Sequence, residues 1–421
     1  MSDRPMGPLS EVELATKDES TPPGSVVIEV VAAPPAINIP DGGLQAWLSV
    51  LGGYVPDCTT TFGYSNSFGV FQDYMCARNG LTVIETLDFH VVVVGLPAGK
   101  LFFDQGYFHY VVGSGSILYV FCMFMLSLAN PHKYYQLVLS QGIGMGIGSG
   151  LMLVPAMSVQ THHWRVRRSL AMGIVMTGSG VGGLIYPIML NKLVNGSAGF
   201  AWGVRATAFL TLGLLAIANA VMTTRLPSAR KRGPGPKPDM KAIRRTGRTG
   251  YLRSGTLFLV LWGMFFPYFY LQLWVNLHRL SGRWQVTVIQ IAILNAASIF
   301  GRTLPNMLAD RVGPFNVLAP VAVITSALVL AMFGVTSTGA VIVFSILYGF
   351  FSGASAIRLG LGYFVTSFAM LTGTPIAGAL FDEGGRWYKP IVFNSVIMFA
   401  GASCLIVARS LVARAKGSQH V

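Results

Sequence analysis

The chain has 421 residues, of which 52% are hydrophobic and only 11% are charged. A soluble protein of this length needs many more charges to cover its surface, so the composition excludes an ordinary soluble domain. The formal net charge of +14 could indicate nucleic-acid binding. The basic residues, however, lie in short connectors between apolar segments, where the positive-inside rule places them. We therefore expect a membrane protein with no nucleic-acid partner.

Residues 1–40 form a polar, acidic, proline-containing segment. They lack the basic region followed by an apolar core that is typical of a cleaved signal peptide. We expect a disordered cytosolic N-terminal tail.

Beyond residue 40, apolar segments alternate with turn residues and charges. A bilayer core about 30 Å thick requires roughly 20 apolar residues of helix. The segments that meet this length in the first half are 44–71, 82–103, 108–129, 134–159, 169–190 and 201–223. Those in the second half are 255–277, 285–308, 315–335, 338–357, 359–381 and 390–411. The alternative is eleven spans, because residues 338–381 must hold two spans in 44 residues.

A basic linker, residues 224–254, separates the two sets of six. It contains ten Lys or Arg residues and a single acid, Asp239. Its GPGPKP run, residues 233–238, excludes a continuous helix. A basic loop of this kind is typical of a cytosolic connector that faces anionic lipid, and an even number of spans on each side places both termini in the cytosol. The domains expected are a tail (1–40), two six-helix bundles (41–223 and 255–412), the linker (224–254) and a second tail (413–421).

Two connectors repeat a pattern at equivalent places in the two halves. They are Gly99–Phe108 (GKLFFDQGYF) and Gly301–Gly313 (GRTLPNMLADRVG). Both resemble the loop that follows the second helix of each half in the major facilitator superfamily. The resemblance implies an all-α membrane fold with two six-helix bundles around a central cavity, and gating roles for Asp104, Gly106, Asp310, Arg311 and Gly313. In the first copy Gln105 stands where the pattern has Arg.

Two further segments narrow the resemblance. Pro40–Trp47 (PDGGLQAW) and Trp164–Gly173 (WRVRRSLAMG) resemble the signatures of the monocarboxylate porter family in its fungal form. Ile293–Arg302 and Leu371–Ala379 also resemble fungal members of that family. The resemblance covers about residues 40–412 and implies transport of a small organic anion.

Charged side chains within the expected spans are candidate functional residues, since each costs at least about 2.5–3.5 kcal/mol to insert. Arg302 matches the intramembrane arginine that the monocarboxylate family uses to bind a carboxylate, for which a guanidinium fork is well suited. The alternative is an arginine that extends to the cytosolic interface about 10 Å away. Asp57 is a candidate proton carrier, or else the partner of a polar neighbour. Asp88 and His90, nearer the external end, form either a proton-entry pair or an outer vestibule.

Uncharged polar and aromatic residues are the remaining candidates for the substrate path. They are Tyr64, Asn66, Asn295, Tyr268 and Gln272. The alternative role for each is an interhelical hydrogen bond or simple packing. Where animal monocarboxylate porters carry a lysine in the first span this chain has Asn66, and where they carry an acid before the arginine it has Ser298. The proton–lysine–carboxylate mechanism therefore cannot be transferred whole.

The predicted function is a secondary transporter that moves a small organic anion or a related planar metabolite by alternating access, with protons as the candidate coupling ion. A non-transporting receptor derived from a transporter is the alternative. No enzyme is expected, because HExxH, GxSxG and P-loop patterns are absent, and the four scattered cysteines predict no metal or cofactor. The partners expected are the solute and membrane lipid. The plasma membrane is the expected location, with a vacuolar or other internal membrane as the alternative.

Overall fold

The computed structural model describes part of the chain. The described residues are 41–60, 64, 106–130, 133–224, 255–256, 258–278, 286–354, 369, 372–373, 376–381 and 387–419. The chain divides into two units, residues 1–38 and 39–421, and every described residue belongs to the second unit. The expected N-terminal tail, residues 225–254 of the basic linker and the expected span 82–103 lie outside the described residues.

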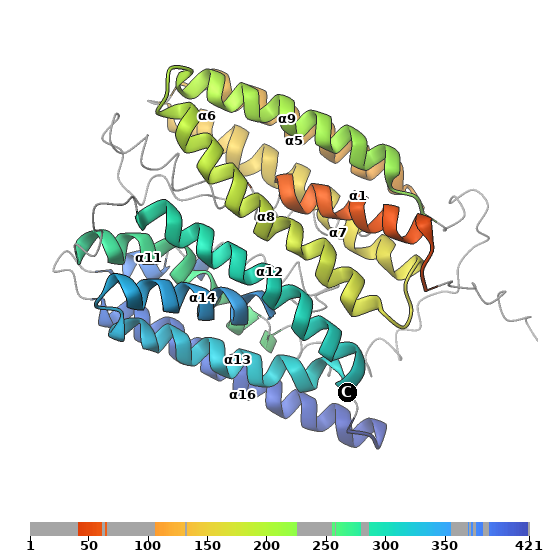
Figure 1. Ribbon diagram of the computed structural model, residues 1–421, viewed down its shortest axis with the longest axis vertical. Helices are drawn as coiled ribbons and strands as arrows, with labels where there is room; N and C mark the ends of the chain where they lie inside the picture. Colours follow the sequence, from red (N-terminus) through yellow and green to blue (C-terminus); the bar gives the residue numbers. More distant parts are fainter. Residues whose placement is uncertain are drawn as a thin grey trace, which may run out of the picture. The chain divides into compact units, whose positions relative to one another are not determined.

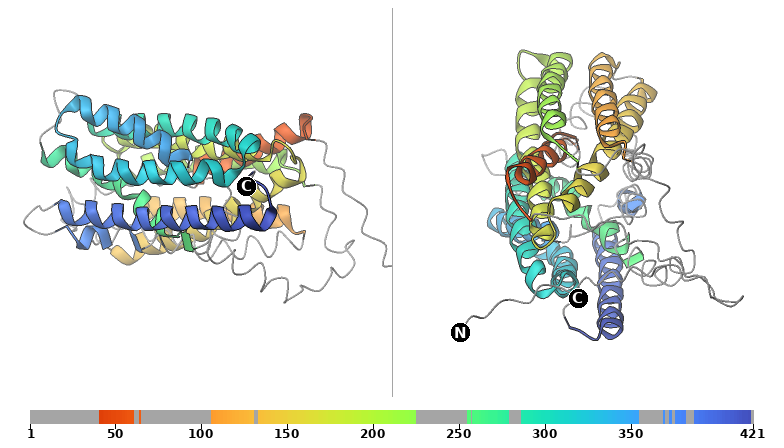
Figure 2. Two further views of the ribbon diagram at one scale, coloured as in Figure 1. Left: turned by 90° about the horizontal axis from the view of Figure 1, so that it is seen from below. Right: turned by 90° about the vertical axis from the view of Figure 1, so that its right-hand side faces the viewer.

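All regular structure in the described part of the chain is helical. The first set of elements is α1 (Leu44–Thr60), α5 (Phe108–Leu128), α6 (Tyr134–Leu137), the π-helix η1 (Val138–Gly144), α7 (Met145–Val159), the 3-10 turn η2 (Gln160–His162), α8 (Arg168–Val194) and α9 (Gly199–Val221). The second set is α11 (Phe266–Leu277), α12 (Val286–Val312), α13 (Pro314–Ala331), the 3-10 turn η4 (Met332–Gly334), α14 (Thr338–Ala354) and α16 (Tyr388–Lys416). Figure 1 shows both sets, and Figure 2 shows α13 and α16 running side by side.

Six helices among the described residues are long and apolar enough to cross a membrane. They are Phe108–Leu128, Tyr135–His162, Arg168–Val194, Gly199–Val221, Pro314–Gly334 and Tyr388–Arg414. Each overlaps a span expected from the sequence. Two shorter apolar helices, Phe258–Leu271 and Thr338–Ala354, overlap two more. One boundary differs in an informative way: α12 continues to Val312 rather than ending near residue 308, so Asp310 and Arg311 lie in its last turn and not in a connector.

The helix that contains α7 is not regular over its whole length. Residues Val138–Gly144 adopt a π-helix between α6 and α7. Gly144 at its end lies against the Cys122 side chain of α5, where an added Cβ would have no room. The Ser140 hydroxyl within it donates to the Gln136 carbonyl at 2.7 Å. A π-helical turn inside an α-helix is rare and often marks a functional segment.

The first set of helices has its own aromatic core. Tyr64 is 1% exposed, and its ring makes edge contacts with those of Tyr119 (6.5 Å) and Tyr186 (6.0 Å). The Tyr186 hydroxyl shares a 3.0 Å hydrogen bond with that of Thr211 in α9. These contacts join α5, α8 and α9 around one buried cluster.

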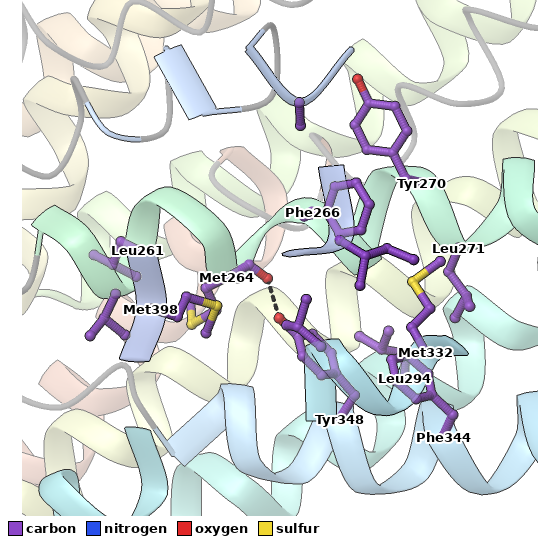
Figure 3. Close-up of a cluster of buried hydrophobic side chains, with 14 of the residues drawn as sticks. Leu261, Met264, Phe266, Tyr270, Leu271, Leu294, Met332, Phe344, Tyr348 and Met398 are labelled. Carbon is purple, nitrogen blue, oxygen red and sulfur yellow. Dashed lines mark hydrogen bonds between the residues drawn. The ribbon is translucent and has the colours of Figure 1, made fainter. Parts of the chain in front are cut away.

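The second set of helices has a separate core, which Figure 3 shows in close-up. The Tyr348 hydroxyl of α14 donates to the Met264 carbonyl at 2.5 Å (Figure 3). The Phe344 ring stacks on that of Tyr348, with centroids 5.5 Å apart. Leu294 of α12 and Met398 of α16 belong to the same cluster.

The two sets meet where α8 packs against α12, which is adjacent to it in Figure 1. The helices are antiparallel, since Ser169 bonds Asp310 at one end and Gly183 bonds Asn295 further along. Gly173 permits the close approach: a Cβ there would lie 2.5 Å from the Arg302 carbonyl oxygen. This seam between α8 and α12 positions the candidate site.

Candidate functional site

Arg302 lies within the α8–α12 seam. Its side chain is 8% exposed, and ten further residues of α12 follow it before the helix ends at Val312. Ten residues of α-helix correspond to about 15 Å, more than the distance expected from the sequence. The side chain also bonds to α8 rather than extending toward the helix end. The side chain is therefore held within the seam, and its role in binding a solute stays a prediction.

The Arg302 guanidinium binds neutral oxygens of α8. Its Nη1 donates to the Met176 carbonyl at 2.6 Å and to the Ser179 hydroxyl. Its Nε is buried and has no hydrogen-bond partner in the described part of the chain. Because a buried guanidinium is most stable beside an anion, this arrangement leaves donor capacity for an acidic group.

Asp57 reaches the same turn of α8 from the opposite side. It follows Pro56 in α1 and is 2% exposed. Its Oδ2 accepts the backbone N–H of Ser179 at 2.9 Å. Gly178 lies directly against the Tyr54 carbonyl of α1, so the two helices approach closely at this level. Asp57 and Arg302 are therefore connected through a single residue, Ser179.

Two helices of the second set contribute hydroxyl groups near Arg302. The Tyr268 hydroxyl shares a 3.1 Å hydrogen bond with that of Ser352 in α14. Tyr268 also lies within electrostatic range of the Arg302 guanidinium. We call Asp57, Ser179, Arg302, Tyr268 and Ser352 the central polar cluster; it draws on α1, α8, α11, α12 and α14. Ser179 and Ser352 were not predicted from the sequence, and only the neighbouring glycines, Gly178 and Gly353, marked those places as closely packed.

The other predicted substrate residues lie in different surroundings. Asn295 is fully buried in the seam, and its Nδ2 donates to the carbonyls of Ile291 (2.9 Å) and Gly183 (3.3 Å). Tyr64 lies in the aromatic core of the first set of helices. Their roles as substrate ligands stay predictions. The predicted residues Asn66, Asp88, His90 and Asp104, and the side chain of Gln272, lie outside the described residues.

Asp310 connects the two sets of helices at one end of the seam. Its Oδ1 accepts the N–H of Ser169 at 3.2 Å and its Oδ2 accepts that of Leu170 at 3.0 Å. These donors belong to the first turn of α8, whose N–H groups have no partners within the helix and favour an anion. Arg311 follows in the last turn of α12.

The glycines of the two repeated loops share an unusual backbone conformation. Gly106 has φ 88° shortly before α5, and Gly313 has φ 100° immediately before α13. A residue with a side chain rarely adopts such angles, so glycine lets the chain reverse tightly into the next helix. The sequence repeat thus corresponds to a repeated local geometry.

The two signature segments of the sequence contact each other. Asp41 Oδ1 accepts the backbone N–H of Val166 at 2.7 Å and also that of Arg165. The rings of Trp47 and Trp164 meet edge to face, with centroids 5.2 Å apart. The connector before α8 is therefore bound by Asp41 and Trp47, and the first turn of α8 that follows it is bound by Asp310.

These observations define a polytopic helical membrane protein with a buried arginine between its two sets of helices and a buried aspartate, Asp57, within the first set. The sequence matches the model of the Major Facilitator Superfamily over residues 86–357. The chain belongs to this superfamily and is a membrane transporter of its type.

Several curated fungal proteins are similar over most of the chain. The Aspyridones efflux protein apdF of Emericella nidulans is 36% identical over 93% of this chain and 82% of its own length. The MFS-type transporter opdF of Penicillium oxalicum is 34% identical over 90% of this chain and 92% of its own length. The Agnestins efflux protein AgnL12 of Paecilomyces divaricatus is 33% identical over 82% of this chain and 83% of its own length.

Solved structures are similar in fold. The transporter FucP in the outward conformation matches over 87% of this chain and 98% of the FucP chain, with a TM-score of 0.61 and 15% sequence identity. The predictions of the superfamily, of its all-α fold and of a multi-pass membrane transporter are confirmed. The narrower prediction of a monocarboxylate porter is not confirmed, because these relatives are named as efflux proteins and MFS-type transporters.

Proposed function

We propose that this protein is a secondary transporter that exports a small organic solute bearing an acidic group, a carboxylate or a similarly acidic planar ring. The two bundles, residues 41–223 and 255–412, would alternate in access around the central polar cluster. Arg302 is the observation that carries the proposal, because it is a buried guanidinium bonded only to neutral oxygens among the described residues. Its fork can bind an acidic group through two parallel hydrogen bonds.

Export, rather than uptake, is supported by the names of two relatives, the aspyridones and agnestins efflux proteins. The earlier expectation of a monocarboxylate substrate is retained here only as a chemical class: an organic anion recognised by arginine. Binding of a solute to Arg302 would compete with its bonds to Met176 and Ser179. Such competition links solute binding to separation of α8 from α12.

Proton coupling through Asp57 is part of the proposal. Asp57 is buried in the last turn of α1 and is joined to Arg302 through Ser179. Tyr54 and Cys58 are the neighbouring titratable groups on its own helix. A carboxyl in this position can bind a proton when the arginine binds an anion, because the two charges otherwise stabilise each other.

Counterflow exchange tests this function without assuming a direction of transport. The full chain is reconstituted in lipid vesicles loaded with benzoate, a planar monocarboxylate, and entry of radiolabelled benzoate is measured. We expect exchange by the natural protein and loss of most of it in Arg302→Lys, since an ammonium keeps the charge but not the fork.

Arg205→Lys in α9 is the matched control. Arg205 lies over the Trp202 ring and donates to Ser127, away from the cluster, so exchange should be kept. Equal exchange in the two variants would refute the role of Arg302. Binding of benzoate without any exchange would instead favour a non-transporting receptor.

A further inference from the structure

Ser179 contacts both charged residues of the central polar cluster. Its backbone N–H donates to Asp57 Oδ2 at 2.9 Å, and its hydroxyl accepts from Arg302 Nη1. The same hydroxyl donates to the Met176 carbonyl at 2.8 Å, which Arg302 Nη1 also binds at 2.6 Å. One turn of α8 therefore binds α1 through a backbone N–H, and binds α12 through a backbone carbonyl and a side-chain hydroxyl.

The hydroxyl of Ser179 serves as a substitute acceptor for the arginine. A serine hydroxyl has one donor hydrogen and two acceptor lone pairs. Here the hydrogen binds Met176, which leaves the oxygen free to accept from Arg302. A neutral oxygen is a weaker partner for a guanidinium than a carboxylate is, so an acidic solute can replace it.

We propose that Ser179 is a positioning residue that holds Arg302 against α8 when no solute is bound and releases it when an acidic group binds. Release breaks a bond across the α8–α12 seam at the turn that also binds Asp57. Ser179 thereby connects solute binding at Arg302 with the surroundings of Asp57. This inference rests on the proposed function only in taking the group that displaces the Ser179 hydroxyl from Arg302 to be the acidic group of the solute.

The chain offers a matched control on the same helix. Thr177 is buried, and its hydroxyl donates to the Ile174 carbonyl three residues earlier, as that of Ser179 does to Met176. Thr177→Ala and Ser179→Ala therefore each remove a hydrogen bond from a side-chain hydroxyl to the carbonyl three residues earlier. Only Ser179→Ala also removes an acceptor of Arg302.

The first test needs no solute. The rate at which phenylglyoxal labels Arg302 in the reconstituted full chain is measured by peptide mass spectrometry. Ser179→Ala should label about three- to tenfold faster than the natural protein, because a charge-assisted hydrogen bond no longer holds the guanidinium. Thr177→Ala and Ser179→Thr, which keeps the hydroxyl, should label at the natural rate. Equal rates in Ser179→Ala and Thr177→Ala would overturn the inference.

The second test uses benzoate binding and exchange. Ser179→Ala should bind benzoate about three- to tenfold more tightly, since the bond between Arg302 and Ser179 no longer has to be broken first, yet exchange it more slowly. A purely structural residue would lower affinity and exchange together, and that result would overturn the release step. Faster labelling together with no benzoate binding by the natural protein would support the role of Ser179 and refute the proposed solute class.

Discussion

The carboxylate of Asp310 accepts the backbone N–H of Ser169, and so joins the last turn of α12 to the first turn of α8. Leu170 provides a second N–H to the same carboxylate. An acid at a helix N-terminus contributes about 0.3–1 kcal/mol, and up to about 2 kcal/mol when partly buried. Here that free energy stabilises one arrangement of two helices from different halves of the chain.

Asp310→Asn should therefore shift the population toward states in which α8 and α12 are separated at this end. A loss of about 1 kcal/mol corresponds to roughly a fivefold change in the ratio of states. Spin labels on cysteines introduced at Arg167 and Val312 would report the distance between the helix ends, with the native cysteines replaced. A longer-distance population should grow in Asp310→Asn.

Asp41→Asn is the control for that measurement. Asp41 also accepts two backbone N–H groups, from Arg165 and Val166, but lies just before α1 in the same set of helices as α8. The Asp41→Asn variant should leave the distribution of distances between the two spin labels unchanged. A similar shift in both variants would mean that general loosening of the connector, rather than the α12 contact, sets the distance.

Gly173→Ala should impair transport by preventing close approach of the two helices. The added Cβ would lie 2.5 Å from the Arg302 carbonyl oxygen and 2.9 Å from Asn306 Nδ2, so α12 must move away. We expect benzoate exchange to fall by about tenfold or more, since overpacking of this kind costs about 1–3 kcal/mol. Gly213→Ala in α9 is the control, because nothing lies within 4 Å of its added Cβ and alanine favours the helix. Undiminished exchange in Gly173→Ala would show that the seam need not close as tightly during transport.

Asp57→Asn should separate exchange from proton-driven accumulation. The asparagine oxygen can still accept the Ser179 N–H, so the local structure should be kept. The amide cannot bind a transported proton, however. We expect benzoate counterflow to continue while accumulation driven by a pH gradient is lost. Gradient-driven accumulation at the natural level in this variant would exclude Asp57 as the proton carrier.

The sequence predicted the helices well where apolar length alone decides them. The long charge-free stretch 134–159 and the expected span 201–223 coincide closely with helices of the structure. The end of α12 was misplaced because the apolar residues stop before the helix does. The chain remains helical through Asp310 and Arg311 until Gly313, whose positive φ ends it.

The candidate site was predicted only one residue at a time. Arg302 and Asp57 could each be recognised, because a charge within an apolar segment is costly. Their connection could not, because it passes through Ser179 in a third helix and uses a backbone N–H and a backbone carbonyl. Serine is common in membrane helices, and nothing in the local sequence distinguishes Ser179 from Thr177. The surroundings of Tyr64 likewise depend on Tyr119 and Tyr186, which are distant in sequence.

The π-helical segment Val138–Gly144 makes the register of its helix adjustable. A π-helical turn holds about one residue more than an α-helical turn, and one residue of α-helix corresponds to about 100° of rotation. Loss of a single residue within this segment could therefore be absorbed by conversion to regular α-helix. The face that α7 presents to α5, including the contact between Gly148 and Gly115, would keep its orientation. This stretch is accordingly a place where the chain can change length by one residue without disturbing the packing on either side.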